Sequence, residues 1–365
     1  MKYFRLLSFS VVLFLVSSPV FVLAQDIVEE DQREGVYGAV INATILEYTI
    51  EKGRSISDTF ELRHDYPEVD LVVTLYPVTV DFTGDNKTGT PVFLDKGRNK
   101  PKTSLEDWIK PLDRSYTVTE LGDTADVNFQ INVPADAEPG SYTAALLLSD
   151  TEYDPSAGPN QVALASRLGP LVFVTVPGDI RSDLEVDSFD VVDAWFNGPF
   201  LGMFEWHPLN FVLTLRNAGN VYLTPGGSIT VHQGDLAKPT FLIQNINENR
   251  GSVLSGTTRE FVNTWSDSAF RFDGTYNEQT KQTDYSFGVH AKDLDKIRFG
   301  RYTATLQLFY NDKATGENTR VDYAVSFWLI PWKIILILAA VIGGYYYFKT
   351  RVINKKGKKK SLMHN

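Results

Sequence analysis

The stretch Gly140-Ser141-Tyr142-Thr143-Ala144-Ala145-Leu146 decides the expected fold, because it recurs as Gly300-Arg301-Tyr302-Thr303-Ala304-Thr305-Leu306. The first copy continues an alternation of apolar and polar residues that is typical of a half-buried β-strand. Each copy precedes one further apolar strand, within residues 162–176 in the first case and 321–327 in the second. The repetition therefore predicts two similar β-domains in one chain.

Two tyrosines occupy the same place in these copies. In immunoglobulin-like sandwiches, a tyrosine early in the penultimate strand bonds back to the chain upstream and forms a tyrosine corner. We therefore expect tyrosine corners at Tyr142 and Tyr302, and a fold of two tandem immunoglobulin-like β-sandwiches. Chance similarity of a short strand motif is the alternative explanation.

The remaining pattern between residues 25 and 326 also indicates an all-β fold. Strict alternation at Val127, Phe129, Ile131 and Val133 predicts a strand. Clusters of turn-forming residues at 83–86, 138–140 and 224–227 separate such runs. One short helical turn is expected over residues 104–110, with Ser104 as its cap.

The expected domain boundary is Pro177-Gly178-Asp179, which follows a continuous apolar run. It divides the chain into a first sandwich over residues 25–178 and a second over residues 179–326. Residues 1–24 carry Lys2 and Arg5, then a largely apolar run and a small residue, Ala24, before polar sequence. That order is typical of a secretory signal peptide.

An apolar stretch over residues 327–348 predicts a C-terminal transmembrane helix, because 22 helical residues reach roughly 33 Å. Basic residues crowd the tail at 349–365, which favours a cytoplasmic tail and an extracellular bulk. The expectation is a single-pass type I protein of the cell membrane; a buried core helix or a removed sorting signal are the alternatives. The expected anchor residues are Trp328, Trp332, Lys333, Tyr345, Tyr346, Tyr347, Lys349 and Arg351.

Charge and cysteine content exclude several classes of function. The formal net charge of the chain is −10. Ten basic residues lie outside residues 25–332: two in residues 1–24, Lys333, and seven in residues 349–365. Residues 25–332 therefore carry a net charge of −20. Such a surface repels nucleic acid, so no nucleic-acid partner is expected. The chain has no cysteine, which excludes disulfides and cysteine chemistry and favours a bacterial origin for an exported protein.

A series of motifs runs along nearly the whole chain: Leu121-Gly122-Asp123, the run from Val127 to Tyr142, Arg167-Leu168-Gly169-Pro170, Val176-Pro177-Gly178, Leu215-Arg216-Asn217-Ala218-Gly219-Asn220-Val221 and Trp328-Leu329-Ile330-Pro331-Trp332-Lys333. In these motifs and in the order of its parts, the chain resembles the bacterial WxL-interacting surface proteins. The resemblance implies two immunoglobulin-like domains, the first linked to peptidoglycan binding and the second to partner binding, and it transfers no individual ligand-contacting residue. The segment 266–296 departs from the pattern.

No catalytic residues are predicted. His64, His207, His232 and His290 fall in different segments without metal-ligand spacing, and no nucleophile motif is present. No cofactor is expected apart from a calcium hypothesis, because clustered carboxylates suit Ca²⁺. Ordinary turn chemistry is the alternative for these clusters. The candidate calcium residues are Asp81, Asp85, Asp187, Asp190 and Asp193.

Aromatic residues crowd two separate segments, 195–206 and 270–287. Exposed rings on the rim of a sandwich could stack on sugars or anchor a protein. Alternatively, they plug the end of a sandwich, or the first segment closes the second domain onto the first. The candidate ligand contacts are Trp195, Trp206, Phe272 and Tyr276.

These observations predict a non-catalytic, membrane-anchored bacterial cell-surface protein. Its expected partners, besides the membrane, are peptidoglycan or other surface proteins, through which it would serve adhesion or envelope organisation. The alternative is an assembly or scaffold factor for surface proteins or appendages, acting through protein–protein contacts and an unpaired edge strand.

Overall fold

Strands dominate the computed structural model, which describes residues 39–65, 73–94, 104–150, 152, 167–234, 236–277 and 279–361. The expectation of a mostly β chain is confirmed. The predicted signal peptide, residues 1–24, lies outside the described residues. From Gly38 onward the chain forms one compact unit.

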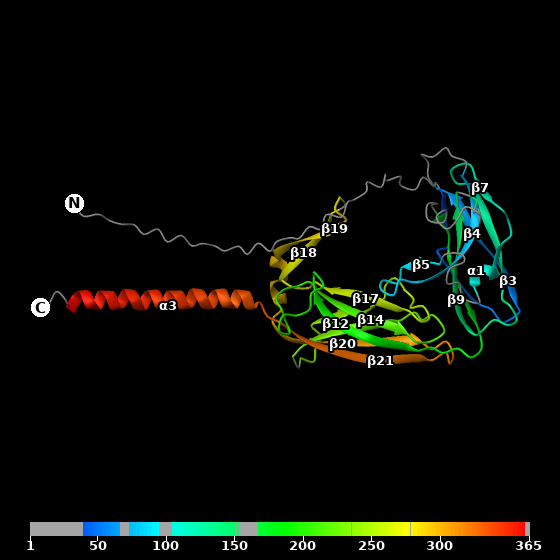
Figure 1. Cartoon of the computed structure of the whole chain (residues 1–365). Helices are drawn as coiled ribbons and strands as arrows, with labels where there is room; N and C mark the ends of the chain where they lie inside the picture. Colours follow the sequence, from blue (N-terminus) through cyan, green and yellow to red (C-terminus); the bar gives the residue numbers. More distant parts are fainter. Residues whose placement is uncertain are drawn as a thin grey trace. The chain divides into compact units, whose positions relative to one another are not determined.

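The first sandwich consists of two facing sheets (Figure 1). The smaller sheet has the order β1-β3-β8-β6. Its strands are β1 (Ala39–Ile41), β3 (Ser55–His64), β8 (Thr124–Asn132) and β6 (Ile109–Pro111). The larger sheet has the order β2-β11-β9-β4-β5, with β7 paired to β4 and β10 paired to β9. Its strands are β2 (Ile45–Thr49), β11 (Leu171–Val176), β9 (Gly140–Ser149), β4 (Val73–Gly84), β5 (Pro91–Phe93), β7 (Tyr116–Val118) and β10 (Arg167–Leu168).

The first core lies between these sheets because alternate residues of their strands point inward. Val127, Phe129 and Ile131 of β8 are fully buried and face apolar residues of β9 and β11. The short helix α1 (Leu105–Trp108) adds Trp108, whose ring lies 4.5 Å from that of Tyr142. Ser104 makes no side-chain cap bond to this helix; its hydroxyl donates instead to the carboxylate of Asp81.

The second sandwich pairs a three-stranded sheet with a five-stranded one. The first contains β12 (Leu184–Asp193), β14 (Leu209–Asn217) and β17 (Thr258–Trp265). The second contains β13 (Met203–Phe204), β21 (Asn318–Leu329), β20 (Gly300–Asn311), β15 (Gly226–Gln233) and β16 (Phe241–Ile243). Both sheets contribute to a single apolar core around the fully buried Trp265.

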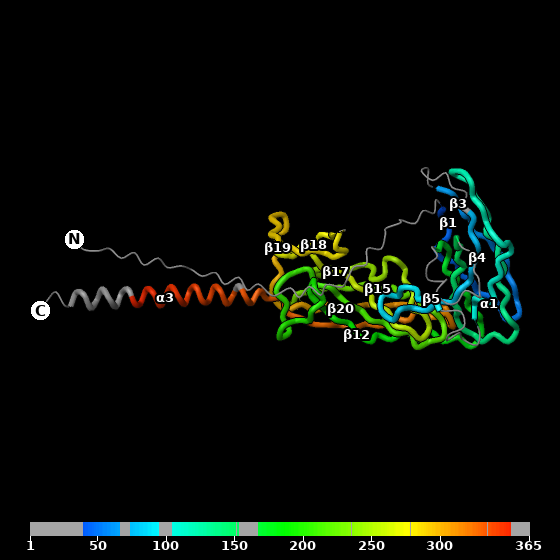
Figure 2. Tube along the Cα trace, turned by 45° about the horizontal axis from the view of Figure 1, so that its top comes forward, coloured from blue at the N-terminus to red at the C-terminus, as the bar shows by residue number. Residues whose placement is uncertain are grey.

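A separate hairpin follows β17 and occupies the segment that departed from the expected pattern. It consists of β18 (Phe270–Asn277) and β19 (Gln282–Val289) and leads into the 3₁₀ helix η1 (Ala291–Lys296). Figures 1 and 2 show this hairpin at the end of the second sandwich from which the C-terminal helix leaves.

Both repeat tyrosines bond to the chain just upstream. The Tyr142 hydroxyl donates to the carbonyl of Glu138 over 2.8 Å. The hydroxyl of the fully buried Tyr302 accepts from the amide of Phe299 over 3.1 Å. This is the local geometry expected of a tyrosine corner, with donor and acceptor roles reversed between the two copies.

Asn220 connects the two sandwiches. The side-chain NH₂ group of Asn220 donates to the backbone carbonyls of Pro139 and Asp179, each over 3.1 Å. Its backbone carbonyl accepts from the amide of Ser141 over 2.9 Å. The predicted boundary at residues 177–179 lies between β11 and β12, beside this contact.

The C-terminal helix α3 (Trp332–Ser361) differs from the prediction of a helix over residues 327–348. Phe327, Trp328 and Leu329 instead end β21, with the first and third buried and the second exposed. Their alternation fits a strand that closes the apolar core. Pro331 follows and suits the turn before a helix. Within the described residues, no helix is both long and apolar enough to cross a membrane.

Candidate functional site

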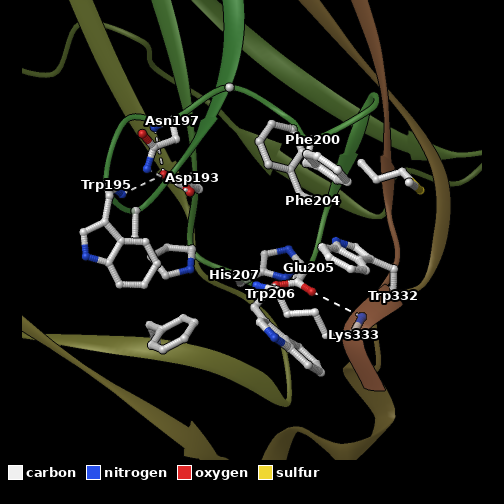
Figure 3. Close-up of a pocket in the computed structure, with 15 residues that line it drawn as sticks. Asp193, Trp195, Asn197, Phe200, Phe204, Glu205, Trp206, His207, Trp332 and Lys333 are labelled. Carbon is white, nitrogen blue, oxygen red and sulfur yellow. Dashed lines mark hydrogen bonds and ion pairs between the residues drawn. The ribbon is translucent and has the colours of Figure 1, made fainter. Parts of the chain in front are cut away.

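The main candidate site is a pocket at the α3 end of the second sandwich, with a volume of about 520 Å³ (Figure 3). Three segments far apart in the sequence line it: residues 193–208, Phe272 of β18, and the first two residues of α3. The lining is rich in aromatic rings and also contains Asp193, Asn197, Glu205 and Lys333. Such a mixture of apolar walls and a few polar groups is typical of ligand pockets.

Asp193 shapes the first segment. Its carboxylate accepts hydrogen bonds from the amides of Trp195 and Asn197, each over 2.8 Å, and so closes a tight turn after β12. Phe196 and Leu201 have φ angles of 59° and 49°, in the left-handed region that bulky residues rarely adopt. Strained backbone of this kind is concentrated at functional sites.

The hairpin packs its rings against this segment. Trp195 lies 4.9 Å from Phe272 and 5.4 Å from Tyr285, measured between ring centroids. Trp206 lies 5.2 Å from Phe287. The two aromatic segments that were predicted separately therefore form one cluster.

A backbone hydrogen bond also joins the hairpin to this segment. The amide of Phe272 donates to the carbonyl of His207 over 2.7 Å. This contact lies at the α3 end of the second sandwich, so the segment 195–206 closes that end rather than the junction with the first domain.

His207 forms part of the pocket lining although its side chain is 1% exposed. Its ring meets Trp265 edge-on at 4.4 Å. Among the described residues, neither ring nitrogen has a hydrogen-bond partner. Burial lowers the pKa of His207 to about 3, and the nearby positive charge of Arg298 acts in the same direction. The imidazole is therefore neutral near pH 7, with one N–H donor and one acceptor nitrogen.

The first turn of α3 forms one wall of the pocket. Trp332 stacks on Phe200, with ring centroids 5.3 Å apart. The ammonium of Lys333 lies 2.7 Å from the carboxylate of Glu205, as Figure 3 shows. The pocket is therefore complete only when the start of α3 is present.

The acidic groups of the pocket already have partners. The Asp193 carboxylate is engaged by turn amides, and the Glu205 carboxylate is paired with Lys333. In the part of the chain that the structure describes, no three His, Asp or Glu side chains group as a metal site would require. What the pocket offers a ligand is stacking surface with hydrogen-bonding groups at its edge.

The candidate calcium residues are used in other ways. Asp85 accepts from the hydroxyl of Thr88 and from three turn amides, which holds its pKa well below the ordinary value. Asp81 is buried and accepts from Ser104 and from the amide of Glu106. Asp187 pairs with Arg216, whereas Asp190 is exposed on β12. Turn and strand chemistry accounts for these contacts.

Three of the four predicted ligand contacts line the pocket: Trp195, Trp206 and Phe272. Tyr276 does not; it is 62% exposed, toward the turn of the hairpin. Sequence reasoning missed Phe200, Glu205 and His207 as pocket residues. Sequence composition does not reveal the left-handed backbone at Phe196 and Leu201, which flank Phe200. A single histidine without a partner at metal-ligand spacing does not indicate a site.

The predicted anchor residues divide into two groups. Trp332 and Lys333 belong to the pocket, and Trp328 is exposed on β21. The others lie on α3, where Tyr345, Tyr346 and Tyr347 are exposed. The ammonium of Lys349 lies 5.9 Å from the ring centroid of Tyr345, and the guanidinium of Arg351 lies 5.1 Å from that of Tyr347.

No family model matches the chain, and no curated protein matches it. Three solved structures illustrate the structural similarity. The class 5 fimbriae chaperone CfaA is 9% identical, with a TM-score of 0.32 over 69% of this chain and 99% of its own. The YadV chaperone is 8% identical, with a TM-score of 0.32 over 79% and 100%. The CsuC–CsuE chaperone–tip adhesion subunit complex of Acinetobacter baumannii is 10% identical, with a TM-score of 0.32 over 78% and 97%. Scores this low transfer no function to this chain.

Proposed function

We propose that the protein is a non-catalytic bacterial cell-surface protein, held at a membrane through α3, that binds a glycan chain of the cell wall. Cell-wall binding agrees with what the resemblance to WxL-interacting proteins implies. The proposal differs in placing the binding site on the second sandwich, where the resemblance implies partner binding.

One observation carries the proposal: aromatic rings from three segments line one pocket whose edge carries carboxylate, amide and ammonium groups. The C–H faces of sugar rings pack on aromatic rings, and their hydroxyl groups need such hydrogen-bonding partners. The pocket volume of about 520 Å³ falls within the range of small-ligand sites.

Membrane attachment is supported by the apolar surface of α3. Ile335, Leu338, Val341 and Phe348 are each about half exposed or more. A helix that exposes apolar side chains all round its surface needs an apolar environment. Lipid provides that environment, and the chain would then place its sandwiches outside the cell.

Sedimentation of the detergent-solubilised full chain with isolated cell-wall sacculi tests the glycan proposal. Trp195→Ala should reduce binding about tenfold, because losing one stacking contact costs about 1.4 kcal/mol. Tyr276→Ala is the control, since Tyr276 is exposed on the hairpin that packs against Trp195 but lies outside the pocket. If the wild-type chain stays in the supernatant, or Trp195→Ala pellets as well as wild type, the proposal is wrong.

A second candidate is an assembly or scaffold role through protein contacts. Within the described residues, β12 pairs with β14 on one side and with no strand on the other. A partner strand could add to this edge. The exposed carboxylate of Asp190 on this edge would favour a basic partner.

A photo-crosslinker tests this edge. The probe replaces Asp190, which is exposed on β12, and a control probe replaces the exposed Glu317, which lies outside β12. The scaffold role predicts a discrete surface-protein adduct from position 190 and none from position 317. Equal labelling from the two positions would remove this candidate.

A further inference from the structure

We infer that the α3 end of the second sandwich rests on the surface of a lipid bilayer, with apolar side chains from the end of β19 to the residue before β20 entering the interfacial zone. The inference rests on the proposed membrane attachment through α3. The side chains concerned are Val289, Leu294, Ile297 and Phe299.

The connection between the sandwich and α3 is too short to hold this end away from the surface that α3 enters. Only Ile330 and Pro331 separate β21 from α3. Two residues span about 7 Å at most. The ion pair of Lys333 with Glu205 and the stacking of Trp332 on Phe200 further bind the helix to the sandwich.

The strand register places the apolar residues at this same end. Gly300 of β20 pairs with Leu329 of β21, the last strand residue before α3. Phe299, immediately before Gly300, therefore lies level with the link to the helix. Ile297 and Leu294 precede it, the latter in η1.

Exposed apolar surface is concentrated here. Val289, Leu294, Ile297 and Phe299 are 61%, 52%, 56% and 52% exposed. In the described residues before α3, about half of the exposed large apolar side chains fall in the segments 194–208 and 266–299. Isolated exposed apolar residues are normal, whereas a concentration of them marks an interaction surface.

The charge of this end also suits a bilayer. The segments 194–208 and 266–299 together hold seven acidic and five basic residues, a net charge of −2. Several of these charges are already paired. Asp267 bonds to Lys296 and Arg298, and Arg271 bonds to Asp273 and Asp293. The end nearest the helix therefore has little charge to repel anionic lipid.

Continuity with α3 favours lipid over a soluble protein as the occupant. The apolar surface extends onto the helix, whose side chains from Ile335 to Phe348 are exposed wherever the structure describes them. A protein would have to cover both the sandwich end and all sides of a helix. A bilayer covers both at once.

Single-cysteine labelling tests the inference, because the chain has no native cysteine. Full-length Leu294→Cys and Ile297→Cys variants carry an environment-sensitive dye and are reconstituted into phosphatidylcholine vesicles that contain lipid-attached nitroxides. Leu121→Cys, 58% exposed in the first sandwich, is the surface control. Leu338→Cys reports on α3 itself.

The expected result is a loss of most dye fluorescence at positions 294, 297 and 338, and none at 121. Quenching at 338 without quenching at 294 and 297 would overturn the inference while leaving membrane attachment intact. Failure of quenching at 338 would overturn membrane attachment, and the inference with it.

Discussion

The ammonium nitrogen of Lys333 lies 2.7 Å from a carboxylate oxygen of Glu205, although 128 residues separate them in the sequence. Glu205 follows β13, and Lys333 lies in the first turn of α3. Both line the pocket. The residue that sequence reasoning assigned only to the membrane end of the chain therefore also belongs to the binding site, so the pocket and the C-terminal helix form one structural unit.

Removing the charge of Lys333 should affect binding more than stability. The Lys333 side chain is 64% exposed, and exposed ion pairs contribute less than about 1 kcal/mol. Lys333→Met should therefore leave the Tm nearly unchanged in thermal unfolding but weaken glycan binding severalfold. Lys238→Met, at an exposed site outside the pocket, is the control and should change neither. A large fall in the Tm of Lys333→Met would contradict this account.

Acid should destabilise the protein through His207. The pKa of this group is about 3 in the folded chain and near 6.5 when unfolded, so the unfolded chain binds more protons between these values. Above about pH 6.5, His207 has no effect on how the free energy of unfolding depends on pH. Below that, the free energy of unfolding falls by about 1.4 kcal/mol per pH unit toward pH 3. His207→Asn should flatten the pH dependence of the unfolding free energy over this range. Unchanged slopes in His207→Asn would be inconsistent with a buried neutral imidazole.

The hydroxyl of Tyr302 should contribute measurably to stability. Tyr302→Phe removes the hydroxyl acceptor of the Phe299 amide, and losing a typical intramolecular hydrogen bond costs about 0.5–1.5 kcal/mol. Denaturant unfolding of this variant should show a lower midpoint and an unchanged slope. Tyr276→Phe, which alters an exposed hydroxyl, should unfold like wild type. Equal denaturation midpoints for the two variants would show that the Tyr302 hydroxyl does not stabilise the fold.

Calcium should not stabilise the first sandwich through Asp85. The carboxylate already accepts hydrogen bonds from the amides of Lys87, Thr88 and Gly89. Millimolar calcium should therefore leave the Tm unchanged, whereas Asp85→Ala should lower it in the absence of any metal. A calcium-dependent rise in Tm that Asp85→Ala abolishes would restore the metal hypothesis.

Sequence patterns predicted the strands where periodicity and burial agree. Val127, Phe129 and Ile131 alternate in the sequence and are fully buried in the structure. The repeated motif likewise located Tyr142 and Tyr302, because a tyrosine corner depends on local sequence. The boundary predicted at residues 177–179 rests on turn-forming residues, and these residues lie between β11 and β12 in the structure.

The start of α3 and the assembly of the pocket could not be predicted in the same way. Phe327 and Leu329 are apolar in either a helix or a strand, and only pairing with β20 assigns them to a strand. Trp195 and Phe272 lie 77 positions apart, and their contact depends on a backbone bond from the hairpin to His207. Long-range contacts of this kind leave no periodic signal.

The most direct test of glycan binding is a titration of the full chain with soluble cell-wall glycan fragments, followed by tryptophan fluorescence. Trp195, Trp206 and Trp332 all line the pocket, so occupancy should change their emission. We expect saturable binding in wild type and Tyr276→Ala, about tenfold weaker binding in Trp195→Ala, and partial recovery in Trp195→Phe, which restores a ring. No saturable change in wild type, or equal affinity in Trp195→Ala, would contradict the assignment of this pocket as the glycan site.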